Sequence, residues 1–197
     1  GDGEVTQSQF YEAVIHSHAR LTYTQVGAVI AEGWHDEVDS EHYGEIGRLH
    51  GLYEVLRAAR DRRGAIDFDT VETQIVFNDD RKIDAIVPVH RNDAHKLIEE
   101  CMLAANVATA EFLERSELPI LYRVHEGPST ERLTNLRAFL GELALDLPGG
   151  ETPTPEDYQS VLSQLEGRED APVIQTMMLR SLRQAVYQPE NKGHFGL

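Results

Sequence analysis

One stretch of the chain, residues 91–115, constrains the fold more than any other. Asn92 and Asp93 stand where a side chain can cap the free N–H groups of a first helical turn. From Leu97 onward, apolar residues recur at helical spacing along one side and also on the opposite side. A helix that is apolar all round is usually buried. We therefore expect a long buried helix from Asp93 to Arg115.

Polar side chains interrupt this apolar pattern. Glu99, Glu100 and Asn106 lie inside it, and a buried carboxylate is costly unless it is paired or faces a wet cavity. Two interpretations stay open at this point. Either the glutamates pair with Lys96 or with nearby arginines, or the helix lines a polar channel.

The length and composition of the chain indicate an ordinary globular protein. The 197 residues are 41% hydrophobic and 26% charged, which fits one domain with a sizeable core better than a disordered chain. A single cysteine excludes an internal disulfide framework and fits a reducing cytoplasm. No signal-type N-terminal stretch and no bilayer-length apolar run occur in the sequence. We therefore expect a cytoplasmic protein with no membrane partner and no disulfide-linked partner.

The charge balance argues against a simple nucleic-acid-binding module. The 34 acidic and 18 basic residues give a net charge of −16, whereas a module that binds duplex usually carries a basic patch. Taken alone, the charge favours an acidic enzyme or an interaction domain.

Periodicity and turn residues predict an α+β fold: a helix-rich mixed domain with short antiparallel strands. We expect strands at 10–15, 71–77, 83–89 and 118–124, the second and third forming a hairpin. We expect helices at 22–31, 46–63, 93–115, 128–143, 156–165 and 172–187, with a loop at 34–45.

Several motifs carry a resemblance to a known family. The run RNDAHKLIEECMLAAN at 91–106 resembles the signature of the ribonuclease II/ribonuclease R (RNB) family, closest to its ribonuclease R branch. Other segments agree in the family's order: FYEAVIHSHARLTYTQV at 10–26, LHGLYEVLRAARDRRGAIDFD at 49–69, LYRVHEGPSTERL at 121–133, LPGG at 147–150 and QTMMLRSLRQAVYQPENKGHFGL at 175–197. The resemblance covers nearly the whole chain.

The resemblance implies a function for a longer parent enzyme. It implies an enzyme that hydrolyses single-stranded RNA processively in the 3′→5′ direction, uses magnesium, and releases nucleoside 5′-monophosphates. Enzymes of this family thread the strand through a narrow channel, so a local basic lining is compatible with an acidic exterior. A non-catalytic RNA-binding or regulatory relative that keeps the RNB fold is the alternative.

The resemblance also implies that residues 1–197 are a partial RNB domain. The family's aspartate cluster, resembling Asp-x-x-x-x-x-Asp-x-Asp-Asp, would lie upstream, and its arginine motif downstream. We therefore expect no catalytic residue and no magnesium ligand in this chain, and no activity from the chain alone.

Two candidate RNA-binding positions lie in the first half of the chain. Tyr23 resembles the family's aromatic contact to RNA, since an aromatic face stacks on any base; the alternative is a tyrosine that packs on its neighbours. Glu99 or Glu100 resembles a family glutamate near the 3′ sugar, where a carboxylate can accept from a 2′-hydroxyl. For these two, ion pairing is the alternative.

The other candidates are basic and lie in the second half. Arg123, His125 and Arg132 bracket a predicted strand, turn and helix, and the helix start at Ser129 can hold a phosphate. Arg180, Arg183 and Lys192 add positive charge that lines the strand path or compensates a helix dipole. His194 is expected to approach substrate in the intact domain and to be loosely held in this chain.

Two patterns resemble metal sites, and we interpret neither as one. Asp67 and Asp69 are spaced to chelate a hard cation, yet they fit a solvated strand entry better. His16 and His18 share a face at the end of a predicted strand, but zinc needs further ligands. We expect no metal-binding residue.

Overall fold

The structure is a computed structural model, and it describes residues 2–68 and 72–196. The chain divides into two compact units: unit 1 is Gly1–Ala59 with Gln74–Leu118, and unit 2 is Arg60–Thr73 with Pro119–Leu197. No helix in the described ranges is both long enough and apolar enough to span a membrane.

Unit 1 begins with an extended segment that leads into helix α1. The predicted strand at 10–15 is wrong: these residues are exposed and join no strand among the described residues. A strand needs a neighbour to satisfy its backbone groups, and this segment has only a ring contact, in which Phe10 stacks on Phe112 at 4.6 Å. His16 and His18 consequently lie in exposed chain and not at a strand end.

Helix α1, Tyr23–Glu32, confirms the prediction to within one residue. Thr22 and Gln25 form a capping box, and Gly33 ends the helix with a φ of 84°. The predicted loop at 34–45 is wrong at its end. Asp39 caps a short 3₁₀ turn, Ser40–His42, which leads directly into helix α2, Tyr43–Arg62.

Helix α3, Asp93–Arg115, has the predicted bounds because its N-terminus is capped locally. The Asn92 side chain accepts from the N–H groups of Ala94 and His95. The prediction that this helix is buried all round is wrong, since Met102 and Val107 are exposed. Helix α1 packs against α3. Within the described part of unit 1, only part of the apolar surface of α3 is therefore covered.

Strands β1, Glu72–Phe77, and β2, Ile83–Val89, pair in a two-stranded sheet. A turn closes the pair, with the N–H of Asn78 donating to the carbonyl of Lys82 at 2.9 Å. So short a connection joins antiparallel strands, which confirms the predicted hairpin over 72–77 and 83–89. Residue 71 lies outside the described residues.

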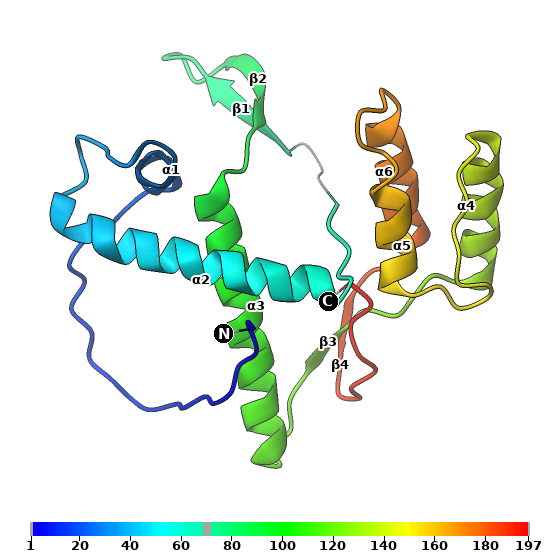
Figure 1. Cartoon of the computed structure of the whole chain (residues 1–197), viewed down its shortest axis with the longest axis horizontal. Coiled ribbons are helices and arrows are strands. Elements are labelled where there is room, and N and C mark those ends of the chain that lie inside the picture. The colour runs from blue at the N-terminus through cyan, green and yellow to red at the C-terminus, as the bar shows by residue number, and fades with distance from the viewer. Residues whose placement is uncertain (1, 69–71, 197) are drawn as a thin grey trace. The chain divides into compact units, whose positions relative to one another are not determined.

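Unit 2 is built around three short helices, which Figure 1 shows lying close together: α4, Thr130–Glu142; α5, Pro155–Leu162; and α6, Ala171–Ser181. Ser129 and Thr154 cap α4 and α5. Buried residues from all three helices, from the loops between them and from the segments that follow α2 and α6 form one core: Ile66, Leu133, Leu136, Leu140, Leu145, Leu147, Tyr158, Val161, Leu165, Ile174, Met178 and Leu182. The predicted helices at 128–143 and 156–165 are confirmed with shorter bounds.

The predicted final helix at 172–187 is wrong in its second half. Helix α6 stops at Ser181, because Leu182 adopts an extended conformation with φ −74° and ψ 156°. Strand β4, Val186–Gln188, then pairs antiparallel with β3, Tyr122–Val124. Pairing with a distant strand overrides helical spacing here, as β-branched and aromatic residues allow. Strand β3 is also shorter than the predicted 118–124.

Candidate nucleic-acid interface

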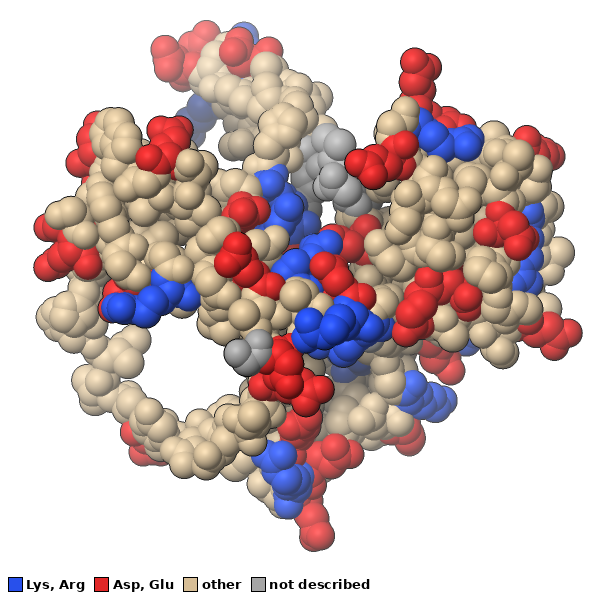
Figure 2. All heavy atoms as spheres, in the orientation of Figure 1, with Lys and Arg blue, Asp and Glu red and all other residues tan. Residues whose placement is uncertain are grey.

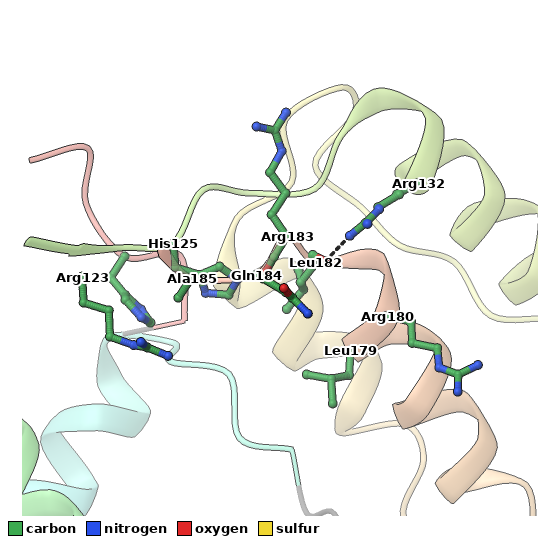
Figure 3. Close-up of a pocket in the computed structure, with 10 residues that line it drawn as sticks. Arg123, His125, Arg132, Leu179, Arg180, Leu182, Arg183, Gln184 and Ala185 are labelled. Carbon is green, nitrogen blue, oxygen red and sulfur yellow. Dashed lines mark hydrogen bonds between the residues drawn. The ribbon is translucent and has the colours of Figure 1, made fainter. Parts of the chain in front are cut away.

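A cavity of about 780 Å³ in unit 2 gathers most of the basic candidates (Figure 3). Ten residues line it: Arg123, His125, Arg132, Leu179, Arg180, Leu182, Arg183, Gln184, Ala185 and His194. They come from β3, from α4, from the end of α6 and the segment after it, and from the chain near the C-terminus. A volume of this size is typical of pockets that hold small molecules or single polymer units.

Strand alternation places the β3 contribution. Successive side chains on a strand point to opposite faces, and Val124 is turned into the core with 1% of its surface exposed. Arg123 and His125 therefore share the opposite face, which forms one wall of the cavity. Arg180 comes from the last turn of α6, where the helix ends at Ser181.

The electrostatics of this lining differ from those of the rest of the chain. The described lining residues include four arginines, two histidines and no carboxylate, in a chain whose net charge is −16. Figure 2 shows acidic side chains scattered over the visible face of the molecule. The cavity is therefore a local site of positive potential on an acidic protein.

Two of the four arginines are already engaged by protein groups. Arg132 donates to the carbonyl of Leu182 at 2.5 Å, and Arg183 donates to the carboxylate of Glu126 at 2.9 Å. Arg180 makes no hydrogen bond or ion pair with the described residues. In Figure 3, Arg180 and Arg183 extend in different directions, so the positive charge is spread along the cavity.

Arg123 lies over an aromatic ring. Its guanidinium lies 5.5 Å from the centre of the Tyr187 ring, because Arg123 and Tyr187 are direct partners in the β3–β4 register. A cation–π contact of this kind stabilises the guanidinium without neutralising its charge.

The two histidines lie edge to face, with ring centres 5.0 Å apart. His125 Nε2 donates to the carbonyl of Arg183 at 2.7 Å. His194 Nδ1 is buried without a hydrogen-bond partner in the described part of the chain. Burial, then the charges of His125 and Arg123, lower the pKa of His194 below its usual value.

His194 is not loosely held, contrary to prediction. The N–H of His125 donates to the carbonyl of Gly193 at 3.1 Å, and the N–H of Phe195 donates to the carbonyl of His125 at 2.7 Å. These bonds form a parallel bridge between His125 and His194. The chain at 193–195 is therefore docked on the end of β3.

The remaining candidates lie in unit 1. Tyr23 stacks on His95 with ring centres 4.1 Å apart, and its carbonyl accepts from Asn92 Nδ2 at 2.9 Å. Its side chain is nevertheless 44% exposed. Tyr23 also lines an apolar groove of about 310 Å³ with residues such as Leu97. The Tyr23 ring thus packs on His95 and is also partly exposed.

The two glutamates of α3 differ in their surroundings. Glu99 forms an ion pair with Arg91, and its side chain is 39% exposed. Glu100 is buried, with 5% of its surface exposed. The ion-pair interpretation therefore holds for Glu99, while Glu100 is the carboxylate that α3 keeps inside unit 1.

The described residues contain no group of three or more His, Cys, Asp or Glu placed to hold a metal ion. Asp69, and with it the Asp67–Asp69 pattern, lies outside the described residues. The residues present do not fit the magnesium site that the family resemblance implies.

Comparison with known proteins identifies the family of this chain. A model described as RNB domain matches residues 1–197. This chain belongs to the RNB domain family. The resemblance carried by the motifs is thereby confirmed.

Similar proteins are longer than this RNB chain. It is 54% identical to ribonuclease R of Vibrio cholerae over 199 residues, which are 99% of this chain and 24% of that protein. It is 49% identical to ribonuclease R of Escherichia coli over 203 residues, with the same two shares. The chain therefore spans about a quarter of the length of the curated relatives it matches.

A solved structure supports the fold. Mycoplasma genitalium RNase R in complex with ribose methylated single-stranded RNA matches with a TM-score of 0.81 and 27% identity, covering 88% of this chain and 27% of that one. The predicted α+β fold is thus confirmed.

Six of the ten candidates named from the sequence meet in one cavity of this RNB chain: Arg123, His125, Arg132, Arg180, Arg183 and His194. Tyr23, Glu99 and Glu100 lie in unit 1. Sequence reasoning missed Gln184 and Tyr187. Tyr187 and its neighbour Val186 are residue types that favour strands, but the predicted final helix, 172–187, included both of them.

Proposed function

We propose that the longer protein containing this chain is a hydrolytic 3′→5′ exoribonuclease. It degrades single-stranded RNA processively to nucleoside 5′-monophosphates, and residues 1–197 supply part of one RNB domain. The match of the RNB domain model to the whole chain carries the proposal. Similarity to an RNase R solved with single-stranded RNA supports it.

The cavity of unit 2 contributes electrostatic binding in this proposal. Single-stranded nucleic acid is held by basic grooves that follow the backbone and by aromatic faces on which bases stack. The lining of the cavity offers Arg123, His125, Arg180 and His194 without a competing carboxylate among the described residues. Because screening in physiological salt limits attraction to about 8–10 Å, the acidic exterior does not cancel this local field.

Unit 1 contributes base and sugar recognition in the same proposal. The exposed side chain of Tyr23 stacks on a base, which is worth about 1–3 kcal/mol. Glu100 or Glu99 accepts a hydrogen bond from a ribose 2′-hydroxyl and so favours RNA over DNA. We assign Glu100 the larger effect, because a carboxylate with only 5% of its surface exposed carries a desolvation cost that a channel-facing role explains.

We also propose a cofactor and a location for the longer protein. We propose magnesium as the cofactor of the longer protein, on the family resemblance; the described residues contain no group of three or more His, Cys, Asp or Glu that could hold it. A cytoplasmic location rests on the single cysteine. The roles proposed for this chain are to bind and orient RNA.

The test is a product analysis with the longer protein. A 5′-labelled single-stranded RNA is incubated with magnesium, with a DNA of the same sequence as the control. We expect shortening from the 3′ end and release of nucleoside 5′-monophosphates, while the DNA stays intact. Internal cleavage or shortening from the 5′ end would contradict the proposal, and tight RNA binding without cleavage would favour a non-catalytic relative.

A further inference from the structure

Three residues at the starts of α1 and α3 form a closed set of contacts within unit 1. Asn92 Nδ2 donates to the carbonyl of Tyr23 at 2.9 Å, and His95 Nδ1 lies 2.7 Å from Asn92 Oδ1. The His95 ring in turn stacks on the Tyr23 ring, with ring centres 4.1 Å apart and an angle of 21° between the planes. The backbone and the ring of Tyr23 are therefore both held by the start of α3.

The orientation of the His95 ring is fixed independently of the stack. His95 Nδ1 lies near two groups of Asn92, the side-chain oxygen at 2.7 Å and the backbone nitrogen at 3.3 Å. A protonated Nδ1 donates to the oxygen, and an unprotonated Nδ1 accepts from the N–H, so the ring is tied to the helix cap in either tautomer. The ring cannot turn about its bond to Cβ without breaking this contact.

The close approach of α1 leaves Asn92 little freedom to move. A Cβ at position 27 of α1 would overlap Asn92 Nδ2, so glycine is required for α1 to lie this close to the cap of α3. Asn92 Oδ1 also accepts from the N–H groups of Ala94 and His95. Asn92 therefore cannot shift without losing several bonds, and the stacked pair is held in one arrangement.

Tyr23 nevertheless keeps aromatic surface in contact with solvent. It is 44% exposed although the stack covers one face of its ring, and it borders the apolar groove of about 310 Å³. A tyrosine that served only to pack α1 on α3 would be more favourably buried. An aromatic ring that is ordered in advance and still exposed suits a nucleobase, which stacks on it at little entropic cost.

We propose that His95 is a positioning residue for RNA: fixed by Asn92, its ring holds the Tyr23 ring in the orientation in which a base stacks on it. The inference rests on the base-stacking role proposed above for Tyr23, and it assigns a second residue to that role. His95 acts through Tyr23 and not through a contact of its own with the base.

The expected effect follows from the cost of ordering a side chain. Ordering one flexible side chain at an interface lowers affinity about two- to tenfold, so loss of the His95 ring should weaken the contribution of the base by about that factor. Loss of the Tyr23 ring should weaken it about tenfold or more, because the stacking itself is lost. Contacts to phosphate and sugar should not change.

The experiment measures the binding of two RNAs to the longer protein, in the presence of a chelator so that the RNA stays intact. One RNA is an oligouridylate, and the other is an oligomer of the same length and phosphate charge that lacks the bases. The ratio of their affinities isolates the contribution of the bases. A substitution that only destabilised unit 1 would weaken the binding of both RNAs alike and leave this ratio unchanged.

Two substitutions separate the ring of His95 from its bond to Asn92. His95→Gln keeps an amide that can donate or accept at the helix cap but has no ring, whereas His95→Phe keeps an aromatic ring without the bond. We expect His95→Gln to lower the affinity ratio about two- to tenfold and His95→Phe to retain most of it. His42→Gln, which removes a histidine of unit 1 that contacts Glu41, should leave the ratio unchanged.

The outcomes that overturn the proposal are specific. A wild-type ratio in His95→Gln contradicts it, and so does a loss in His95→Phe that exceeds the loss in His95→Gln, because the bond to the cap would then carry the effect. Far-UV circular dichroism verifies that the compared variants are folded.

Tyr23→Ala distinguishes failure of this proposal from failure of the proposed function. If Tyr23→Ala lowers the ratio and His95→Gln does not, only the positioning role is refuted. If Tyr23→Ala leaves the ratio unchanged, base stacking at Tyr23 is refuted and the role of His95 with it. Hydrolysis of RNA from the 3′ end is tested separately by the product analysis, and neither result alters it.

Discussion

The buried hydrogen bond between Tyr158 and Ser181 offers a sharp test of how unit 2 is held together. The Tyr158 hydroxyl lies 2.9 Å from Ser181 Oγ, and both residues are buried. Ser181 Oγ already donates to the carbonyl of Met178 at 2.6 Å, so Tyr158 must be the donor to Ser181. Burial raises the pKa of Tyr158, which keeps this donor protonated.

The direction of the bond predicts unequal costs for the two substitutions. Tyr158→Phe removes the donor and leaves Ser181 with its own proton satisfied, which should cost about 0.5–1.5 kcal/mol. Ser181→Ala leaves the Tyr158 hydroxyl buried without an acceptor, which should cost about 1–3 kcal/mol. The double variant should cost less than the sum, with a coupling energy of about 1 kcal/mol.

Urea unfolding followed by far-UV circular dichroism measures these free energies. Ser163→Ala is the matched control, because its exposed hydroxyl bonds only to the carbonyl of Gln159 within the described chain; we expect a change within about 0.5 kcal/mol. Equal costs for the two single variants, or strict additivity in the double variant, would refute the reasoning.

Three further predictions concern the longer protein, α3 and the isolated chain. In the longer protein, Glu100→Ala should lower turnover on RNA more than folding stability, whereas Glu99→Ala, which breaks a half-exposed pair with Arg91, should cost about 0–1 kcal/mol; a Glu100→Ala variant that melts early but cleaves normally when folded would contradict this. Asn92→Ala removes the cap of α3 and the bond to the Tyr23 carbonyl, and should cost about 1 kcal/mol in chemical denaturation. The 197-residue chain should not shorten labelled RNA even with magnesium or manganese, and metal-dependent shortening that survives further purification would overturn that expectation.

Local signals explain what could be predicted from the sequence. Helices α1 and α3 begin at capping side chains, Thr22 and Asn92, that bond to backbone within three residues. Such signals are contained in the sequence itself, so both starts were predicted. The turn at Asn78 between β1 and β2 is equally local.

Distant partners explain what could not be predicted. Val186–Gln188 becomes a strand because β3 lies beside it. The spacing of apolar residues along the sequence does not reveal that distant partner. The apolar pattern of α3 indicates burial, yet packing decides which sides are covered. The cavity follows the same rule: Arg123 and Arg180 were candidates by residue type, but only the tertiary fold brings them to one lining.

The most direct test of the central claim is the salt dependence of RNA binding by the longer protein. Each phosphate contact to single-stranded RNA contributes about 0.7 to the slope of log affinity against log salt concentration. Arg123→Gln/Arg180→Gln should therefore reduce the slope by about 1.4. The charge-matched Arg48→Gln/Arg115→Gln variant, which removes two exposed arginines paired on unit 1, should leave it unchanged. Identical slopes in wild type and cavity variant would contradict an RNA path along unit 2.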